Sequence, residues 1–78
     1  MDGKEKDRIL NYMETELAIE SIIKSKGLPA SLVIITEQTI SVTVDKQELD
    51  TSTVAKICDI VMRETGKPAE KIIIQSKY

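Results

Sequence analysis

The chain has 78 residues, which is enough for one domain with a single hydrophobic core. Its formal net charge of -2 and its lack of a polybasic cluster argue against binding to the nucleic-acid backbone or to an anionic membrane surface. The sequence has no histidine and only one cysteine, Cys58, so it excludes an internal disulfide, a zinc site of spaced Cys and His ligands, and a nucleophilic triad with a histidine base.

The N-terminal part of the sequence predicts a charged lead-in followed by a helix. Residues 1–8 are almost all charged, and residues 9–78 are predicted to form the single domain. Gly27 and Pro29 end the helix, because glycine suits the position after a helix and proline prevents its continuation. One apolar stripe with three- and four-residue spacing predicts the core-facing side of this helix: Leu10, Met13 and Leu17.

Two strands joined by a short turn are predicted next. Leu32–Thr36 is an apolar, β-branched run, and Thr39–Asp45 alternates between apolar and polar residues. Only Glu37 and Gln38 separate them, which predicts a β-hairpin although the turn contains neither Gly nor Asn. The apolar residues of the second strand share one face: Ile40, Val42 and Val44.

A second helix and a last strand complete the domain. Asp50 is predicted to cap the helix N-terminus, Gly66 ends the helix, and Glu70–Ser76 has the pattern of a strand. Cys58 falls on the apolar stripe of this helix and is predicted to be a buried, inert thiol and not a catalytic one. The order predicts an α+β fold, a two-layer αββαβ sandwich with both helices on one face of a three-stranded sheet, a topology like that of KH domains.

The first helix and two of the strands carry apolar residues on both of their sides. Helices cover only one face of a two-layer sandwich, so some of these side chains are predicted to face outward. They either pack against another chain, for example by strand addition at a sheet edge, or are ordinary scattered surface residues. The candidate contact residues are Tyr12, Ile19, Ile23, Val33, Ile35 and Ile73.

An enzyme and a nucleic-acid-binding module are the two other classes that a domain of this kind could belong to. Asp45, Glu48 and Asp50 lie close together, but they suit a solvated loop, so no catalytic, metal or cofactor site is predicted. A KH-like RNA-binding module remains the alternative on topology alone, although the GXXG loop that grips the nucleic-acid backbone does not occur.

Four segments resemble the family of stage III sporulation protein AH, in the same order along the chain. They are E-L-A-I-E-S-I-I-K-S-K-G at residues 16–27, L-V-I-I-T-E-Q-T-I-S-V-T-V at 32–44, V-A-K-I-C-D-I-V-M-R-E-T-G at 54–66 and E-K-I-I-I at 70–74. The resemblance implies a ring-building fold, like that of ring components of specialised secretion systems.

The same resemblance implies a structural role without enzymatic activity. The parent protein is expected to be held in the mother-cell membrane by one N-terminal helix, with this domain in the space between mother cell and forespore. There it is expected to bind stage II sporulation protein Q from the forespore side, as part of a channel that links the two cells during engulfment. Copies of the domain are also expected to associate, as a ring would require.

Overall fold

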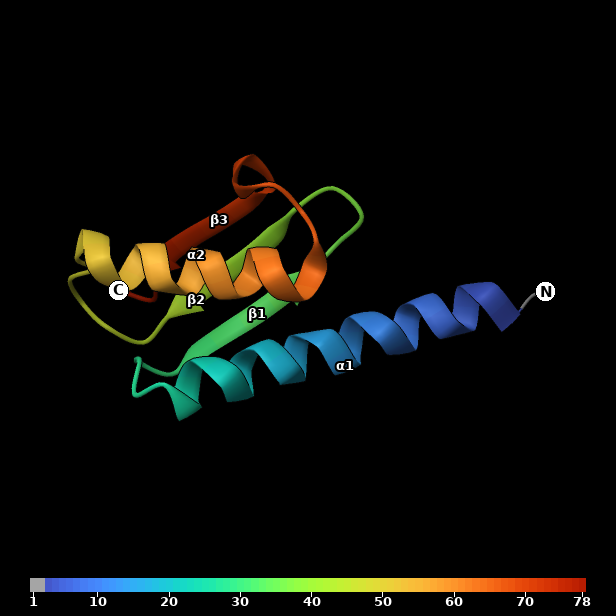
Figure 1. Cartoon of the computed structure of the whole chain (residues 1–78), viewed down its shortest axis with the longest axis horizontal. Coiled ribbons are helices and arrows are strands. Elements are labelled where there is room, and N and C mark those ends of the chain that lie inside the picture. The colour runs from blue at the N-terminus through green and yellow to red at the C-terminus, as the bar shows by residue number, and fades with distance from the viewer. Residues whose placement is uncertain (1–2) are drawn as a thin grey trace.

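Two helices lie against one face of a three-stranded sheet in the computed structural model, which describes the backbone of residues 3–78 and the side chains of residues 12–78 (Figure 1). The elements are α1 Gly3–Ser25, β1 Ser31–Ile35, β2 Ile40–Val44, α2 Thr51–Thr65, η1 Ala69–Lys71 and β3 Ile72–Ser76. Apart from the short 3-10 helix η1, this is the predicted order. The α+β, two-layer αββαβ fold is therefore confirmed.

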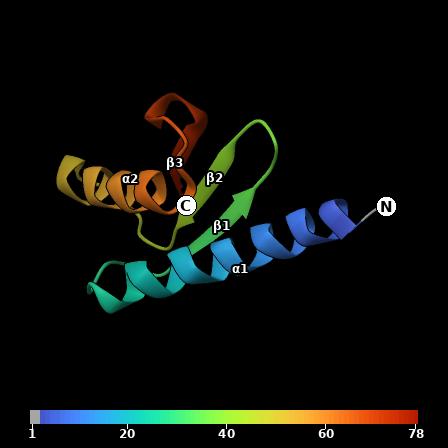
Figure 2. The ribbon, with the colours of Figure 1, turned by 45° about the vertical axis from the view of Figure 1, so that its right-hand side comes forward.

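The sheet has the strand order β1-β2-β3, so β2 is central and the other two strands form the edges. β1 runs antiparallel to β2, and Ile35 lies opposite Ile40 at the end next to the turn. β3 runs parallel to β2, with Ile72 beside Ile40. A parallel pair needs a long crossover connection, and α2 supplies it between β2 and β3 (Figure 2).

The hairpin turn replaces the missing glycine or asparagine with a threonine hydroxyl. Oγ1 of Thr36 accepts hydrogen bonds from the backbone N–H groups of Gln38 and Thr39, at 3.3 and 3.0 Å. The N–H of Thr36 in turn donates to the carbonyl oxygen of Thr39 at 2.8 Å. Because Ser and Thr side chains can satisfy turn backbone groups in this way, the predicted hairpin forms without a residue of positive φ.

Both ends of α2 lie where the sequence predicts them, but the N-terminal cap differs. Gly66 adopts the left-handed conformation, with φ of 72°, and its N–H donates to the carbonyl of Met62. Asp50 occupies the N-cap position, yet its carboxylate accepts from the hydroxyl of Thr53 at 2.5 Å instead of from a backbone N–H.

The core between the helices and the sheet is built from Ile and Val alone among the described side chains. Its strand residues come from the face of the sheet that includes Ile40, Val42 and Val44, as the alternation in β2 predicts. No polar side chain is buried in this part of the chain. The buried residues are Ile19, Ile23, Val33, Ile35, Ile40, Val42, Val44, Ile57, Ile60 and Val61.

Helix α1 presents to the core the side opposite to the predicted one. Ile19 and Ile23 are fully buried, whereas Met13 and Leu17 are 56% and 63% exposed. The predicted core-facing stripe is therefore wrong for these two residues, and the side chain of Leu10 lies outside the described residues. The helix begins at Gly3, so it includes most of the expected lead-in, and its N-terminal half extends past the end of the sheet (Figures 1 and 2).

Candidate protein interface

The face of the sheet that no helix covers carries large aliphatic side chains. Leu32 and Ile34 of β1 are 56% and 49% exposed, and Ile73 of β3 is 48% exposed. We call this surface the open face, and it is formed by Leu32, Ile34, Ser41, Thr43, Ile73 and Gln75.

Strand register brings these side chains together into two rows. Ile34, Ser41 and Ile73 lie side by side across the three strands, so the small serine separates two isoleucines. Leu32 lies beside Thr43 in the next row. A shallow groove of about 280 Å³ continues this row, and it is lined by Ala30, Ser31, Leu32, Thr43, Asp45 and Lys77. The open face thus combines exposed aliphatic side chains with a concave, mostly apolar end, and contact area of this kind suits a protein-binding surface.

The exposed side of α1 adds to the apolar surface beside β1. Glu16 and Glu20 contact the edge of β1, and Ile19 lies on the core side of these glutamates. Met13 and Leu17 lie around the helix on the other side of the glutamates, away from the core, and both are exposed. The exposed apolar side of α1 therefore lies beyond the contact between the helix and the edge of β1.

The outer edge of β1 is closed by two carboxylates of α1. Oε2 of Glu20 accepts a hydrogen bond from the backbone N–H of Val33 at 2.9 Å, and Oε2 of Glu16 accepts from the N–H of Ile35 at 2.7 Å. Glutamates four residues apart lie on one side of a helix, and alternate N–H groups point to one edge of a strand, so the two spacings match. An exposed strand edge invites pairing with another chain, and this contact prevents it at β1.

The structure separates the six candidate contact residues into two groups. Ile19, Ile23, Val33 and Ile35 are buried in the core, so the prediction that these four face outward is wrong. Tyr12 is half-buried and packs against the core, and Ile73 alone is exposed, on the open face.

Sequence reasoning missed Leu32, Ile34, Met13 and Leu17 as the outward-facing apolar residues. For the strand, the signal was present. A turn between Thr36 and Thr39 fixes an antiparallel register that puts Val33 and Ile35 on the same face as Ile40, Val42 and Val44. For α1, the glutamate pair was the available signal. A pair of polar residues does not by itself show whether that side of the helix faces solvent or the edge of a strand.

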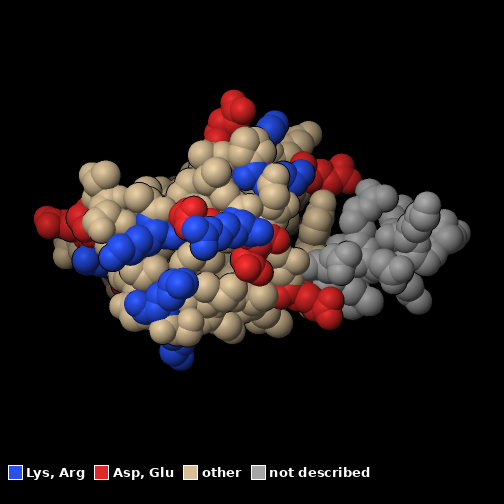
Figure 3. Space-filling view, viewed as in Figure 1, with Lys and Arg blue, Asp and Glu red and all other residues tan. Residues whose placement is uncertain are grey.

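A second concave surface lies between the C-terminal part of α1 and α2. It has a volume of about 570 Å³, and Arg63 is tied to Asp59 at 3.1 Å. Figure 3 shows Lys and Arg side chains running across the α2 side of the molecule, with Asp and Glu among them. Because both signs of charge are mixed there, the surface selects no single class of ligand. It is lined by Ile22, Lys26, Leu28, Lys56, Asp59, Ile60, Arg63 and Glu64.

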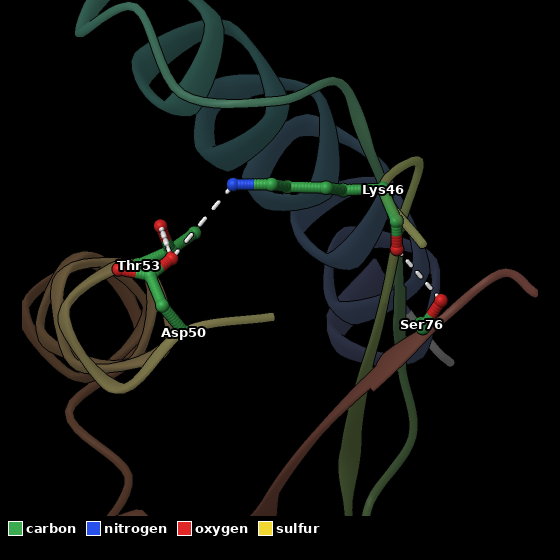
Figure 4. A network of polar contacts seen from close by, with 4 residues as sticks. All are labelled: Lys46, Asp50, Thr53 and Ser76. Atoms are coloured by element: carbon green, nitrogen blue, oxygen red, sulfur yellow. Dashed lines mark hydrogen bonds and ion pairs between the residues drawn. The ribbon is translucent and has the colours of Figure 1, made fainter. Parts of the chain in front are cut away.

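The loop carboxylates between β2 and α2 have structural partners. Asp50 lies 3.8 Å from Nζ of Lys46, and the Thr53 hydroxyl, which donates to it, is the main cause that lowers the pKa of its carboxyl (Figure 4). Asp45 accepts a hydrogen bond from the Tyr78 hydroxyl at 2.7 Å. No cluster of three Cys, Asp or Glu side chains suited to a metal ion occurs within the described residues.

The contact between Tyr78 and Asp45 predicts a measurable effect at alkaline pH. The hydrogen bond to the Asp45 carboxylate, with the negative charge of that group, raises the pKa of Tyr78. Because the pKa of Tyr78 is raised in the folded state, its hydrogen bond to Asp45 contributes fully to stability below the ordinary tyrosine pKa of about 10. This stabilisation is lost as the pH rises through the folded-state pKa. An absorbance titration that follows phenolate formation is expected to show Tyr78 ionising at a higher pH in the wild type than in Asp45→Asn. Equal midpoints would contradict the contact.

Comparisons with known proteins identify the family. None of the described helices combines the length and the apolar character needed to span a bilayer. Searches of curated proteins and of solved structures each found no match. The sequence model of the family described as SpoIIIAH-like protein matches residues 4–74, which includes α1 from its second residue, the whole hairpin, α2 and the first three residues of β3. The chain therefore belongs to the SpoIIIAH-like protein family and is a sporulation protein.

Proposed function

We propose that this domain is a non-enzymatic interaction module of a complex that joins the mother cell and the forespore, and that it binds stage II sporulation protein Q. The parent protein is anchored in the mother-cell membrane by a segment outside this chain, and the domain lies in the space between the two membranes. Family membership supports the sporulation role, and the apolar open face supports the binding role.

The observation that carries the proposal is the pairing of Ile34 and Ile73 across Ser41. Each isoleucine keeps about half of its surface exposed, at 49% and 48%, although nearby strand positions in the core are fully buried. Neighbouring exposed aliphatic residues on an ordered sheet lose little conformational entropy on binding and bury apolar area when a partner covers them. We infer that the partner covers this pair.

Self-association belongs to the same proposal. A ring of copies needs a heterologous contact, in which two different surfaces of neighbouring copies meet. The domain has two unlike surfaces on opposite sides of its sheet, the open face and the concave surface between α1 and α2. Light scattering on the domain alone and on the complex measures whether copies associate.

A titration against the soluble domain of the cognate stage II sporulation protein Q tests the proposal. The wild type is expected to form a complex of defined mass, and the double variant Ile34→Thr/Ile73→Thr is expected to bind at least about tenfold more weakly, since buried anchor side chains dominate interface energy. Threonine keeps the β propensity of the strands, so the fold is expected to persist.

The matched control is Met62→Gln, which replaces an exposed apolar residue of α2, on the helix side of the sheet. This variant is expected to bind like the wild type. Unchanged affinity of the double variant would remove the open face from the interface. No binding by a folded wild-type domain would contradict the proposed partner itself.

A further inference from the structure

The two edges of the sheet differ in what covers them. At the outer edge of β1, the carboxylates of Glu16 and Glu20 accept hydrogen bonds from two backbone N–H groups. β3 forms the other edge, and in Figures 1 and 2 no helix or strand of the described chain lies along its outer side. A strand that adds to this sheet without displacing α1 must therefore add at β3.

The register of β3 shows which of its backbone groups are free to pair. The N–H of Lys77 donates to the carbonyl of Val44 on β2 at 2.8 Å, so the backbone groups of Ile73 and Gln75 also point to β2. The groups of Ile74 between them point away from the sheet, and among the described residues no hydrogen bond reaches the N–H or the carbonyl of Ile74 from that side. These groups are ready donors and acceptors for another strand.

The C-terminal end of β3 is held in place, so this edge is ordered before any partner arrives. The hydroxyl of Ser76 donates to the carbonyl oxygen of Lys46 at 2.7 Å (Figure 4). The N–H of Tyr78 donates back to the Ser76 hydroxyl at 3.0 Å, and the Tyr78 ring lies under Nζ of Lys77 at 5.9 Å from its centroid. Preorganisation of this kind lowers the entropic cost of binding.

The charges at the two ends of β3 determine which kind of strand can pair with this edge. Lys71 precedes the strand and Lys77 follows it, and both are exposed. Two copies that pair antiparallel along the whole strand, with Ile74 at the centre, would set Lys71 of each copy against Lys77 of the other. Like charges directly opposite each other oppose such pairing, whereas carboxylates at these two positions favour it. Glu70 adjoins Lys71, so Lys77 has the stronger influence.

We propose that β3 is the docking edge of the domain and that its occupant is an extended, antiparallel segment of another protein, with aliphatic residues between two carboxylates that lie six positions apart, as Lys71 and Lys77 do. This inference rests on the proposed function, because it names the chemistry of the partner segment. Its main chain pairs with Ile74, one aliphatic side chain packs beside Ile73 on the open face, and one carboxylate meets Lys77.

The experiment uses two blocked peptides of alternating valine and threonine, one with glutamate at both ends and one with lysine at both ends. Amide resonances of the domain report the binding site. The glutamate peptide is expected to shift the amides of Ile74 and Ser76, to bind at least about tenfold more tightly than the lysine peptide, and to weaken as salt rises. Equal binding of both peptides, or shifts at β1 instead, would overturn the proposal.

Two variants refine the test. Ile74→Pro removes an N–H that points away from β2, and it also shortens a side chain that packs against the core. The variant is expected to be less stable but still folded, as circular dichroism checks, and to lose peptide binding; Ile74→Ala, which shortens the side chain and keeps the N–H, is its matched control and is expected to bind. Lys77→Glu is expected to reverse the preference between the two peptides without changing the fold. If Ile74→Pro abolishes self-association of the domain instead, the occupant is a second copy and the proposal is wrong.

The titration against the stage II sporulation protein Q domain separates this inference from the proposed function. Full binding of that partner by Ile74→Pro and Lys77→Glu would overturn the β3 edge while leaving the proposed function intact. Failure of the wild type to bind that partner, together with binding of the glutamate peptide at Ile74, would overturn the proposed partner and support the edge.

Discussion

Replacing Ile23 with alanine is expected to lower the free energy of unfolding by about 3 kcal/mol, because the side chain is fully buried and its removal leaves a cavity in an Ile and Val core. Leu17→Ala, on the exposed side of the same helix, is expected to change stability by less than about 0.5 kcal/mol. In a domain of this size, the first change corresponds to a fall in melting temperature of roughly 12–24 °C.

Urea unfolding followed by circular dichroism measures both variants under the same conditions. Leucine and isoleucine to alanine changes both raise helix propensity, so a difference between the two variants reports burial and not helix formation. A large loss of stability in Leu17→Ala with little change in Ile23→Ala would mean that α1 packs through its Met13 and Leu17 side, as the spacing alone predicts.

The order of elements was predictable because each boundary carries a local signal. Gly27 and Gly66 both adopt positive φ, at 77° and 72°, which only glycine does at low cost. The alternation of β2 identified its core face, because this central strand has polar residues on the other side. Local sequence therefore specified the elements and one face of the sheet.

Periodicity could not predict which side of α1 and which face of β1 point to the core, because both elements are apolar on both sides. α1 lies along the sheet edge, so it has a core side, an exposed apolar side, and between them two glutamates whose partners are backbone groups of β1. A contact between a side chain and the backbone of another element leaves no periodic signal. The same glutamates account for the fact that one sheet edge is closed and the other is open.

Replacing both glutamates, in Glu16→Ala/Glu20→Ala, is expected to lower the free energy of unfolding by about 2–4 kcal/mol. Hydrogen bonds to a charged acceptor contribute about 1.5–3 kcal/mol each, and both sites here are only partly buried, which reduces the sum. Hydrogen exchange at the amides of Val33 and Ile35 is expected to accelerate more than at amides that bond within the sheet. Denaturant unfolding and residue-resolved exchange measure the two effects.

The double variant is also expected to associate with itself, because it exposes the N–H groups of an apolar edge strand that has no charged residue within it or directly beside it. Glu16→Gln/Glu20→Gln is the control, since the amide oxygen still accepts a hydrogen bond while the charge is lost. It is expected to keep the domain monomeric at a smaller cost in stability. If the alanine variant instead retained slow exchange at Val33 and Ile35 and stayed monomeric, the carboxylates would not be what closes β1. A partner strand would then have no reason to prefer β3, because both edges of the sheet would be equally protected or equally open.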